Sequence, residues 1–143
     1  MEKIAVIGGG AAGMMASIFA ARRGMEVHVY EKNEKTGKKL YITGKGRCNL
    51  TNACDMEELL ESVKSNKKFL YSAFYGFTNQ DAYDFFEAEG LKLKVERGNR
   101  VFPMSDRSAD VLDTLRRAMR SAGVQIHLNT EVKSVRKQED GFT

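Results

Sequence analysis

Three glycines near the N-terminus have the spacing that lets a protein backbone approach a pyrophosphate. They are Gly8, Gly10 and Gly13, between the apolar run 3–7 and a run of helix-forming residues that begins at Ala11. In such a strand–turn–helix, the first glycine permits the tight turn, the second admits the pyrophosphate and the third allows close packing of helix on strand. Free N–H groups at the helix N-terminus then stabilise the phosphates. The alternative is a tight turn without a ligand.

An acidic residue follows at the distance expected for a ribose contact. Glu31 ends a second predicted strand, eighteen residues after Gly13. A carboxylate there accepts hydrogen bonds from ribose hydroxyls, and its charge repels a 2′-phosphate, so FAD or NAD is favoured over NADP. The fingerprint does not separate FAD from NAD. However, the segment after Glu31 is basic and glycine-rich, where a classical NAD domain would continue with a second strand–helix–strand unit.

The stretch 43–52, "TGKGRCNLTN", could be a phosphate cradle, a reactive-thiol site, a glycosylation acceptor or an ordinary polar loop. Arg47 is the best candidate cation for a pyrophosphate or for the negative charge of a reduced flavin. Lys39 fits that role and a solvated basic surface equally well. Lys35 and Lys38 are expected to be solvent charges.

Cysteine and asparagine side chains of this stretch each admit two interpretations. Cys48 precedes Cys54 by six residues without a C-x-x-C motif, so a packed or flavin-facing cysteine is favoured over a redox thiol. Asn49 could hydrogen-bond a flavin edge or stabilise a turn through backbone contacts. The sequon Asn49-Leu50-Thr51 has no meaning in a protein that is not secreted.

The elements that must position these residues alternate between strand and helix. The run 3–7 predicts a strand buried on both faces, 11–23 a helix closed by Gly24, and 25–31 a second strand. Strand, helix and strand within about thirty residues predict a parallel βαβ unit with a right-handed crossover. A short helix is expected near 38–42.

Residues 55–90 predict three helices that form a helical insertion. Asp55 is expected to cap the first helix, and Asn79 or Asp81 the last. Aromatic side chains recur on these helices at i, i+3 and i+4 spacings, which favours a buried core over a substrate wall or a platform for stacking bases. They are Phe69, Tyr71, Phe74, Tyr75, Phe77, Tyr83, Phe85 and Phe86.

Residues 91–143 predict a hairpin, a helix and a return strand. Apolar and polar residues alternate over 91–102 around a Gly-Asn turn, as in a β-hairpin. The stretch 108–123 predicts an amphipathic helix capped by Ser108, and 124–137 predicts a strand. The final "EDGFT" resembles the turn of a hairpin whose second strand is missing. The chain is therefore expected to be the N-terminal part of a longer protein.

The bulk composition is that of a soluble globular domain. The 143 residues are 42% hydrophobic and 29% charged, with a formal net charge of +4. These values exclude wholesale disorder and do not fit a dedicated nucleic-acid protein. Two cysteines without nearby histidines argue against a disulfide framework or zinc site and favour the cytoplasm. The glycine run 8–10 argues against a signal peptide or membrane span. We expect no metal, no nucleic-acid partner and no membrane.

Three segments carry a resemblance to a known family. "VIGGGAAGMMAS", "EKNEKTGKKLYITGKGRCNLTN" and "RVFPMSDRSADV" resemble the bacterial FAD-dependent oxidoreductases often labelled NAD(FAD)-utilising dehydrogenases, which include aminoacetone oxidases and bile-acid oxo-steroid reductases. The resemblance implies an α/β fold, namely the N-terminal portion of a Rossmann-like FAD-binding domain of the glutathione-reductase type, with a helical insertion and a small β-hairpin. Within 1–143, it implies βαβ and flavin loop over 1–54, helices over 55–90, and hairpin, helix and return strand over 91–143.

The resemblance also implies which residues approach each part of FAD. Along the pyrophosphate lie Gly8, Gly10, Ala11, Ala12 and Gly13. Glu31 and Lys32 take the adenosine ribose, and Val132 contacts the adenine through its backbone. Basic, small and polar residues approach the ribityl chain and the flavin: Lys39, Thr43, Gly44, Gly46, Arg47, Cys48 and Asn49.

The sequence therefore favours the FAD-binding portion of a flavin-dependent oxidoreductase that transfers hydride, with NAD(P)H as candidate electron donor and an unidentified small molecule as substrate. Catalytic residues are expected in the remainder of the protein, with the substrate domain. The chain has no later "ATGG"-like strand or Gly-Asp motif, so by itself it is expected to bind FAD weakly and to be inactive. Two alternatives are an NAD-binding sensor or scaffold without turnover, and an RNA-binding module, although RRM, KH and helix-turn-helix signatures are lacking.

Overall fold

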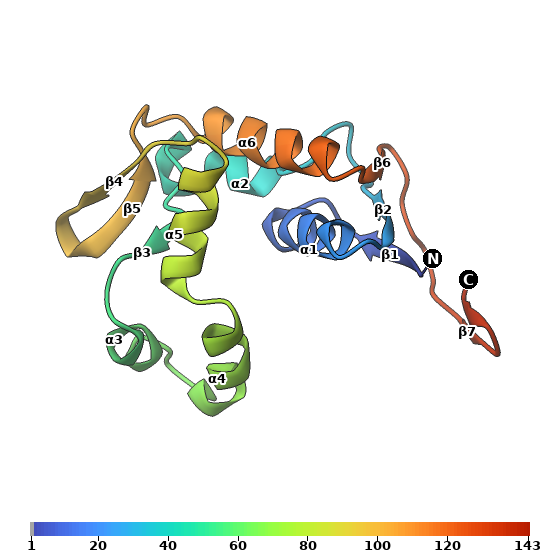
Figure 1. Ribbon diagram of the computed structural model, residues 1–143, viewed down its shortest axis with the longest axis horizontal. Helices are drawn as coiled ribbons and strands as arrows, with labels where there is room; N and C mark the ends of the chain where they lie inside the picture. The colour runs from blue at the N-terminus through green and yellow to red at the C-terminus, as the bar shows by residue number, and fades with distance from the viewer. Residues whose placement is uncertain (1) are drawn as a thin grey trace. The chain divides into compact units, whose positions relative to one another are not determined.

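A computed structural model describes residues 2–143 (Figure 1). The chain forms two compact units. The first, which we call the parallel-sheet unit, comprises residues 2–40 and Leu115–Thr143. The second, which we call the hairpin unit, comprises Tyr41–Thr114. Each unit is described by itself below.

The parallel-sheet unit confirms the predicted βαβ arrangement. Strand β1 (Lys3–Ile7), helix α1 (Ala11–Arg22) and strand β2 (Glu26–Tyr30) follow one another, and β6 (Gln125–His127) completes a sheet of order β1-β2-β6. All neighbours in this sheet are parallel. Parallel strands need a crossover connection, and α1 supplies the one between β1 and β2. The α/β fold class expected from the sequence is therefore confirmed.

The core of this unit comes from apolar residues at helix and strand spacing. Met14 and Ile18 lie one helical turn apart on α1 and are fully buried, as are Val27 and Val29 of β2. Burial of four such side chains stabilises the unit by about 1.5–3 kcal/mol each before conformational entropy is subtracted. Gly24 follows the helix at a φ of +85° and ends it, as predicted.

Helix α6 (Ser108–Ser121) carries the predicted apolar stripe. Val111, Leu115 and Met119 recur every four residues and are all essentially fully buried. The predicted cap at Ser108 is wrong. Ser108 is the first residue of the helix, and its buried hydroxyl donates a hydrogen bond to the carbonyl of Tyr41 at 2.6 Å. Because Ser108 already lies inside the helix, it comes after the cap position, and its hydroxyl serves tertiary packing.

The hairpin unit is built on a small antiparallel sheet of order β3-β5-β4. Strands β4 (Leu93–Glu96) and β5 (Arg100–Pro103) form the predicted hairpin, joined by the short 3₁₀ segment η2 (Arg97–Asn99). Strand β3 (Thr51–Asn52) pairs with β5 and was not predicted. It is only two residues long, too short for an alternation of apolar and polar residues to reveal it.

The helices of this unit form largely where they were expected. They are α2 (Lys38–Ile42), which ends in this unit, then the 3₁₀ segment η1 (Thr43–Gly46), α3 (Met56–Glu61), α4 (Lys67–Gly76) and α5 (Asn79–Ala88). Asp55 caps α3 by accepting a hydrogen bond from the N–H of Glu58 at 2.8 Å, as predicted.

The cap of α5 was predicted wrongly as Asn79 or Asp81. Thr78 is the N-cap, and its hydroxyl accepts a hydrogen bond from the N–H of Asp81 at 3.0 Å. The Asp81 carboxylate in turn accepts one from the N–H of Thr78 at 2.8 Å. This reciprocal capping box satisfies two helix-terminal donors, which a cap by Asn79 or Asp81 alone would not.

The aromatic residues of 69–86 form a core only in part. Phe85 and Phe86 of α5 are buried, but α4 has no buried residue and Phe69 is 85% exposed. The prediction of a buried aromatic core on α4 is therefore wrong. Aromatic residues lie all around α4, and only the Leu70–Phe74 side, with i, i+4 spacing, is half-buried.

The C-terminal residues end in a short hairpin. Strands β7 (Lys137–Gln138) and β8 (Gly141–Phe142) pair in antiparallel fashion, so the predicted turn is confirmed. The expectation that its second strand is missing is wrong, because β8 supplies two paired residues. The return strand predicted over 124–137 is not continuous: it forms only at β6 and at the first residue of β7, since 128–136 form no strand.

Candidate functional site

The turn between β1 and α1 adopts the conformation that the glycine fingerprint requires. Gly8 has a φ of +96°, which side chains other than that of glycine rarely permit. A Cβ on Gly13 would lie only 1.9 Å from the carbonyl oxygen of Gly8. These two glycines therefore let the first turn of α1 pack directly on the end of β1.

The N-terminus of α1 is open in the way an anion site requires. Gly10 is the N-cap and provides no side-chain hydrogen bond, and the first turn contains no acidic residue. A Cβ placed on Gly10 would meet nothing within 4 Å. Ala11 and Ala12 follow and are exposed. The backbone therefore leaves space for a ligand beside Gly10. The free N–H groups of the helix N-terminus favour a ligand with negative charge.

Glu31 is held rigidly beside this turn. Its Oε2 accepts a hydrogen bond from the N–H of Gly9 at 2.7 Å, and its Oε1 accepts from the N–H and side-chain amide of Asn33 at 2.8 and 2.7 Å. Burial opposes ionisation of this carboxyl, but the hydrogen bonds from Asn33 and Gly9 outweigh it, so the pKa of Glu31 lies below its ordinary value. The group is a fixed carboxylate at neutral pH.

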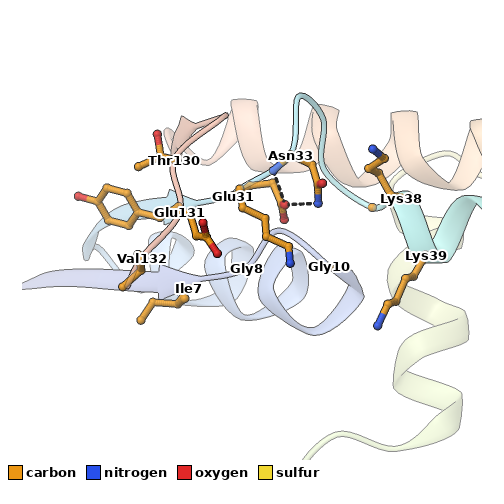
Figure 2. A pocket seen from close by; sticks show the side chains of 13 residues that line it. Ile7, Gly8, Gly10, Glu31, Asn33, Lys38, Lys39, Thr130, Glu131 and Val132 are labelled. Carbon is orange, nitrogen blue, oxygen red and sulfur yellow. Dashed lines mark hydrogen bonds between the residues drawn. The ribbon is translucent and has the colours of Figure 1, made fainter. Parts of the chain in front are cut away.

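A cavity of about 390 Å³ opens between the turn, the end of β2 and residues 130–132 (Figure 2). Its lining brings together six of the residues expected at the cofactor: Gly8, Gly10, Glu31, Lys32, Lys39 and Val132. Figure 2 shows that Glu31 and Val132, a hundred residues apart in sequence, line the same cavity. Pockets of this size hold part of a dinucleotide rather than all of it.

The lining also contains residues that were not predicted: Ile7, Tyr30, Asn33, Gly37, Lys38, Thr130 and Glu131. Asn33 could have been found, because an Asn two residues after an acidic residue can bond to its side chain. No sequence pattern near Thr130 indicates that it lies at the site. It lines the cavity because its N–H donates to the Glu31 carbonyl at 2.9 Å. Lys38, expected as a solvent charge, lines the cavity while it pairs with Glu34 at 3.1 Å.

The segment 43–49 folds onto its own sheet in the hairpin unit. It contains the residues predicted to approach the flavin, namely Thr43, Gly44, Gly46, Arg47, Cys48 and Asn49. Positive φ values recur at Gly44 (+54°), Gly46 (+82°) and Cys48 (+59°), and they coil this segment tightly. The N–H of Cys48 donates to the carbonyl of Thr43 at 3.1 Å. The Asn49 amide nitrogen, oriented to satisfy its neighbours, donates to the carbonyls of Thr51 and Val101 at 3.1 and 3.2 Å.

Arg47 is the centre of an ion-pair network in this unit. Its guanidinium donates to Asp106 at 2.5 and 2.8 Å and to Glu96 at 2.5 Å, and lies 4.1 Å from the centroid of the Phe102 ring. Lys94 completes the network with Asp106 at 2.7 Å. Hydrogen bonds to Glu96 and Asp106 raise the pKa of Arg47. These contacts fasten the 43–49 loop to the hairpin, which favours a structural role for Arg47.

Cys48 is packed beneath this loop. Its side chain is only 3% exposed, and burial raises the pKa of its thiol, an effect that a hydrogen bond with Thr43 partly offsets. A thiol with a raised pKa has little thiolate and reacts slowly. The redox-thiol interpretation is therefore disfavoured.

The family model described as HI0933-like protein Rossmann domain matches residues 2–143. The chain belongs to this family. It is accordingly an FAD-binding Rossmann domain of the kind found in flavin oxidoreductases. The open space at Gly10, the uncapped α1 N-terminus and the fixed Glu31 carboxylate fit the pyrophosphate and adenosine ribose of FAD.

Curated relatives of this HI0933-like chain are longer than the chain itself. The 3-dehydro-bile acid delta(4,6)-reductase of Clostridium scindens is 35% identical over 144 residues, which cover 99% of this chain and 34% of the relative. The ribosomal RNA dihydrouridine synthase of Escherichia coli is 33% identical over 138 residues, which cover 96% of this chain and 34% of that protein. The chain thus spans about a third of the length of the curated relatives it matches.

A solved structure shows the same fold. The open conformation of a flavocytochrome c3 fumarate reductase superposes with a TM-score of 0.62 at 23% identity, covering 97% of this chain and 29% of that one. This likeness supports the α/β Rossmann-type architecture. Among residues 2–143, no helix combines the length and apolar character needed to cross a bilayer.

The role of Arg47 leads to a prediction about Cys48. In a Cys54→Ser background, Arg47→Ala should speed the reaction of Cys48 with a thiol reagent several-fold, because the loop loses its ion pairs to Glu96 and Asp106. The rate of absorbance change with a disulfide reagent measures this. Arg97→Ala, an exposed arginine in the η2 turn of the same unit, is the control and should leave the rate unchanged. Equal rates in both variants would contradict the fastening role.

Proposed function

We propose that the chain is the cofactor-binding portion of a longer FAD-dependent oxidoreductase. The observation that carries the proposal is the Glu31 carboxylate, with both oxygens anchored, beside a turn whose Gly10 faces open space. In this assignment Gly8, Gly10 and the first turn of α1 bind the pyrophosphate, and Glu31 orients the adenosine ribose. Lys32 and Lys39, which line the same cavity, supply positive charge near the phosphates.

FAD supplies the capacity to accept and donate a hydride, which no amino-acid side chain has. The residues of this chain bind and orient the cofactor. Groups that hold a substrate and move protons are assigned to the remainder of the protein, because the relatives are about three times as long. The chain by itself is accordingly proposed to be inactive, and the domain division 1–54, 55–90 and 91–143 is proposed for the longer domain.

The proposed direction of the reaction is reduction of a small-molecule substrate, with NAD(P)H as electron donor. The names of both relatives describe the addition of hydrogen: one is a reductase of a dehydro-bile acid, and the other is a synthase of dihydrouridine. Because the second of these relatives is named for ribosomal RNA, RNA is the competing substrate class.

The experiment is purification of the full-length protein followed by anaerobic titration. We expect bound flavin with its visible absorbance, bleaching by NADH or NADPH, and reoxidation by an unsaturated steroid acid. Reoxidation only by ribosomal RNA would move the substrate class to nucleic acid. Binding of NAD with exclusion of FAD, measured by calorimetry, would instead establish the sensor or scaffold alternative and overturn the proposal.

A further inference from the structure

The peptide groups of Gly9 are held from two directions by the loop that follows β2. The N–H of Gly9 donates to Oε2 of Glu31 at 2.7 Å, and its carbonyl accepts from the N–H of Gly37 at 2.8 Å. Gly9 lies in the middle of the turn that connects β1 to α1. Its two hydrogen bonds therefore fix the orientation of the backbone on which Gly8 and Gly10 face the cavity.

Thr36 packs against the same glycine. Its side chain is 3% exposed, and its Cγ2 methyl would lie 2.7 Å from a Cβ placed on Gly9. The methyl thus occupies the space beside the Gly9 Cα. Since Thr36 directly precedes Gly37, the position of this one residue determines whether the Gly37 N–H can reach the Gly9 carbonyl.

Arg116 of α6 holds Thr36 in that position. Its Nε–H donates to Oγ1 of Thr36 at 3.1 Å, and a terminal N–H donates to the Thr36 carbonyl at 2.8 Å. The two residues are eighty positions apart in sequence, and both belong to the parallel-sheet unit. The planar guanidinium donates to a side-chain and a main-chain acceptor of one residue together, which a lysine ammonium matches poorly.

We propose that Arg116 is a positioning residue of the cofactor site, which fixes the pyrophosphate-binding turn through Thr36 and Gly37. Arg116 does not line the 390 Å³ cavity. It therefore acts on the β1–α1 turn and does not contact the bound cofactor. A turn that is already ordered loses less conformational entropy when a ligand binds. The inference rests on the proposed FAD-binding role for its ligand readout, but its backbone readout is independent of that role.

Arg120 provides a matched control on the same helix. Arg116 and Arg120 lie one turn apart on α6 and line the same hollow of about 270 Å³, together with Thr36. Among residues 2–143, the Arg120 side chain forms no hydrogen bond or ion pair. Arg120→Ala therefore removes the same side chain and charge as Arg116→Ala but leaves the contacts to Thr36 intact.

The first test measures amide hydrogen exchange by nuclear magnetic resonance in the chain without ligand. Arg116→Ala and Arg116→Lys should accelerate exchange of the Gly9 and Gly37 amides at least about tenfold, while Arg120→Ala should leave both rates unchanged. Amides of β2 report the stability of the whole unit. Unchanged Gly9 and Gly37 rates, or β2 amides accelerated by the same factor, would overturn the positioning role.

The second test measures FAD affinity of the same variants by quenching of flavin fluorescence. Both Arg116 variants should bind FAD about tenfold more weakly than Arg120→Ala, which corresponds to about 1.4 kcal/mol. Equal affinities of the Arg116 variants and Arg120→Ala would overturn the inference. If the unsubstituted chain binds no FAD, the proposed function fails for this chain, and the exchange rates alone decide the role of Arg116.

Discussion

Gly13→Ala should destabilise the parallel-sheet unit by about 3 kcal/mol and abolish FAD binding. The new Cβ would lie 1.9 Å from the carbonyl oxygen of Gly8 and 3.1 Å from its carbonyl carbon. Both atoms belong to the backbone and have no rotamer through which to move away. Helix α1 must therefore shift from β1, and Met14 and Ile18 lose part of their packing. Urea unfolding followed by circular dichroism measures the loss.

Gly10→Ala separates this structural effect from the effect on the cofactor. Gly10 has a φ of −78°, which alanine adopts freely, and its Cβ would meet nothing within 4 Å. The free energy of unfolding should fall by no more than about 1 kcal/mol, the typical cost of placing alanine at an N-cap position that glycine tolerates better. FAD affinity should nevertheless fall by about tenfold or more, because the methyl group occupies the space proposed for the pyrophosphate.

The two substitutions together test whether the turn between β1 and α1 binds the pyrophosphate. Undiminished FAD affinity in Gly10→Ala would place the pyrophosphate away from this turn. Retained stability in Gly13→Ala would mean that α1 moves from β1 at little cost, contrary to the packing described. Gly76→Ala is a suitable reference, because it adds the same methyl group in the hairpin unit, where nothing lies within 4 Å.

The parts of the site that the sequence predicted are those fixed by backbone geometry close in sequence. A positive φ at Gly8 and close packing at Gly13 demand glycine, so the pattern Gly8-x-Gly10-x-x-Gly13 reports the turn directly. Glu31 was found because the length of one helix and one strand sets its distance from that turn. The same local logic located α1, β2 and the β4–β5 hairpin.

What the sequence did not reveal depends on contacts between distant segments. Thr130 and Arg116 act on the site through hydrogen bonds to Glu31 and Thr36, and no local pattern marks such pairs. The prediction that aromatic spacing implies a core failed for α4, since periodicity shows which side chains share a face but not whether another element covers it. The roles of Thr43, Gly44, Gly46, Arg47, Cys48 and Asn49 at the flavin stay predictions.

Glu31→Gln should weaken FAD binding by about tenfold or more and lower the free energy of unfolding by about 1–3 kcal/mol at neutral pH. The carboxylate accepts hydrogen bonds from three donors, the N–H of Gly9 and two groups of Asn33. A glutamine presents one oxygen and one NH₂ group, so at least one of these donors faces another donor. The turn loses its anchor, and the ribose loses a charged acceptor.

The pH dependence of this effect has a defined sign. The pKa of Glu31 in the folded protein lies below its ordinary value of 4.5. The stabilisation from its carboxylate is therefore fully present above pH 4.5 and is lost as the pH falls through the lower folded-state value. The difference in unfolding free energy between the unsubstituted chain and Glu31→Gln should be constant near neutrality and shrink in acid. Urea unfolding over a pH series measures it.

Glu34→Gln is the matched control, because it makes the same chemical change three residues away. Glu34 is exposed and pairs with Lys38, the first residue of α2, with side chains 60% and 45% exposed. Surface pairs of this kind contribute little, so both stability and FAD affinity should stay close to those of the unsubstituted chain. If Glu31→Gln and Glu34→Gln bound FAD equally well, the ribose contact would lie elsewhere. If their stabilities also agreed across the pH series, the Gly9–Glu31 anchor would have no energetic role, and the turn would depend on Thr36 and Arg116 alone.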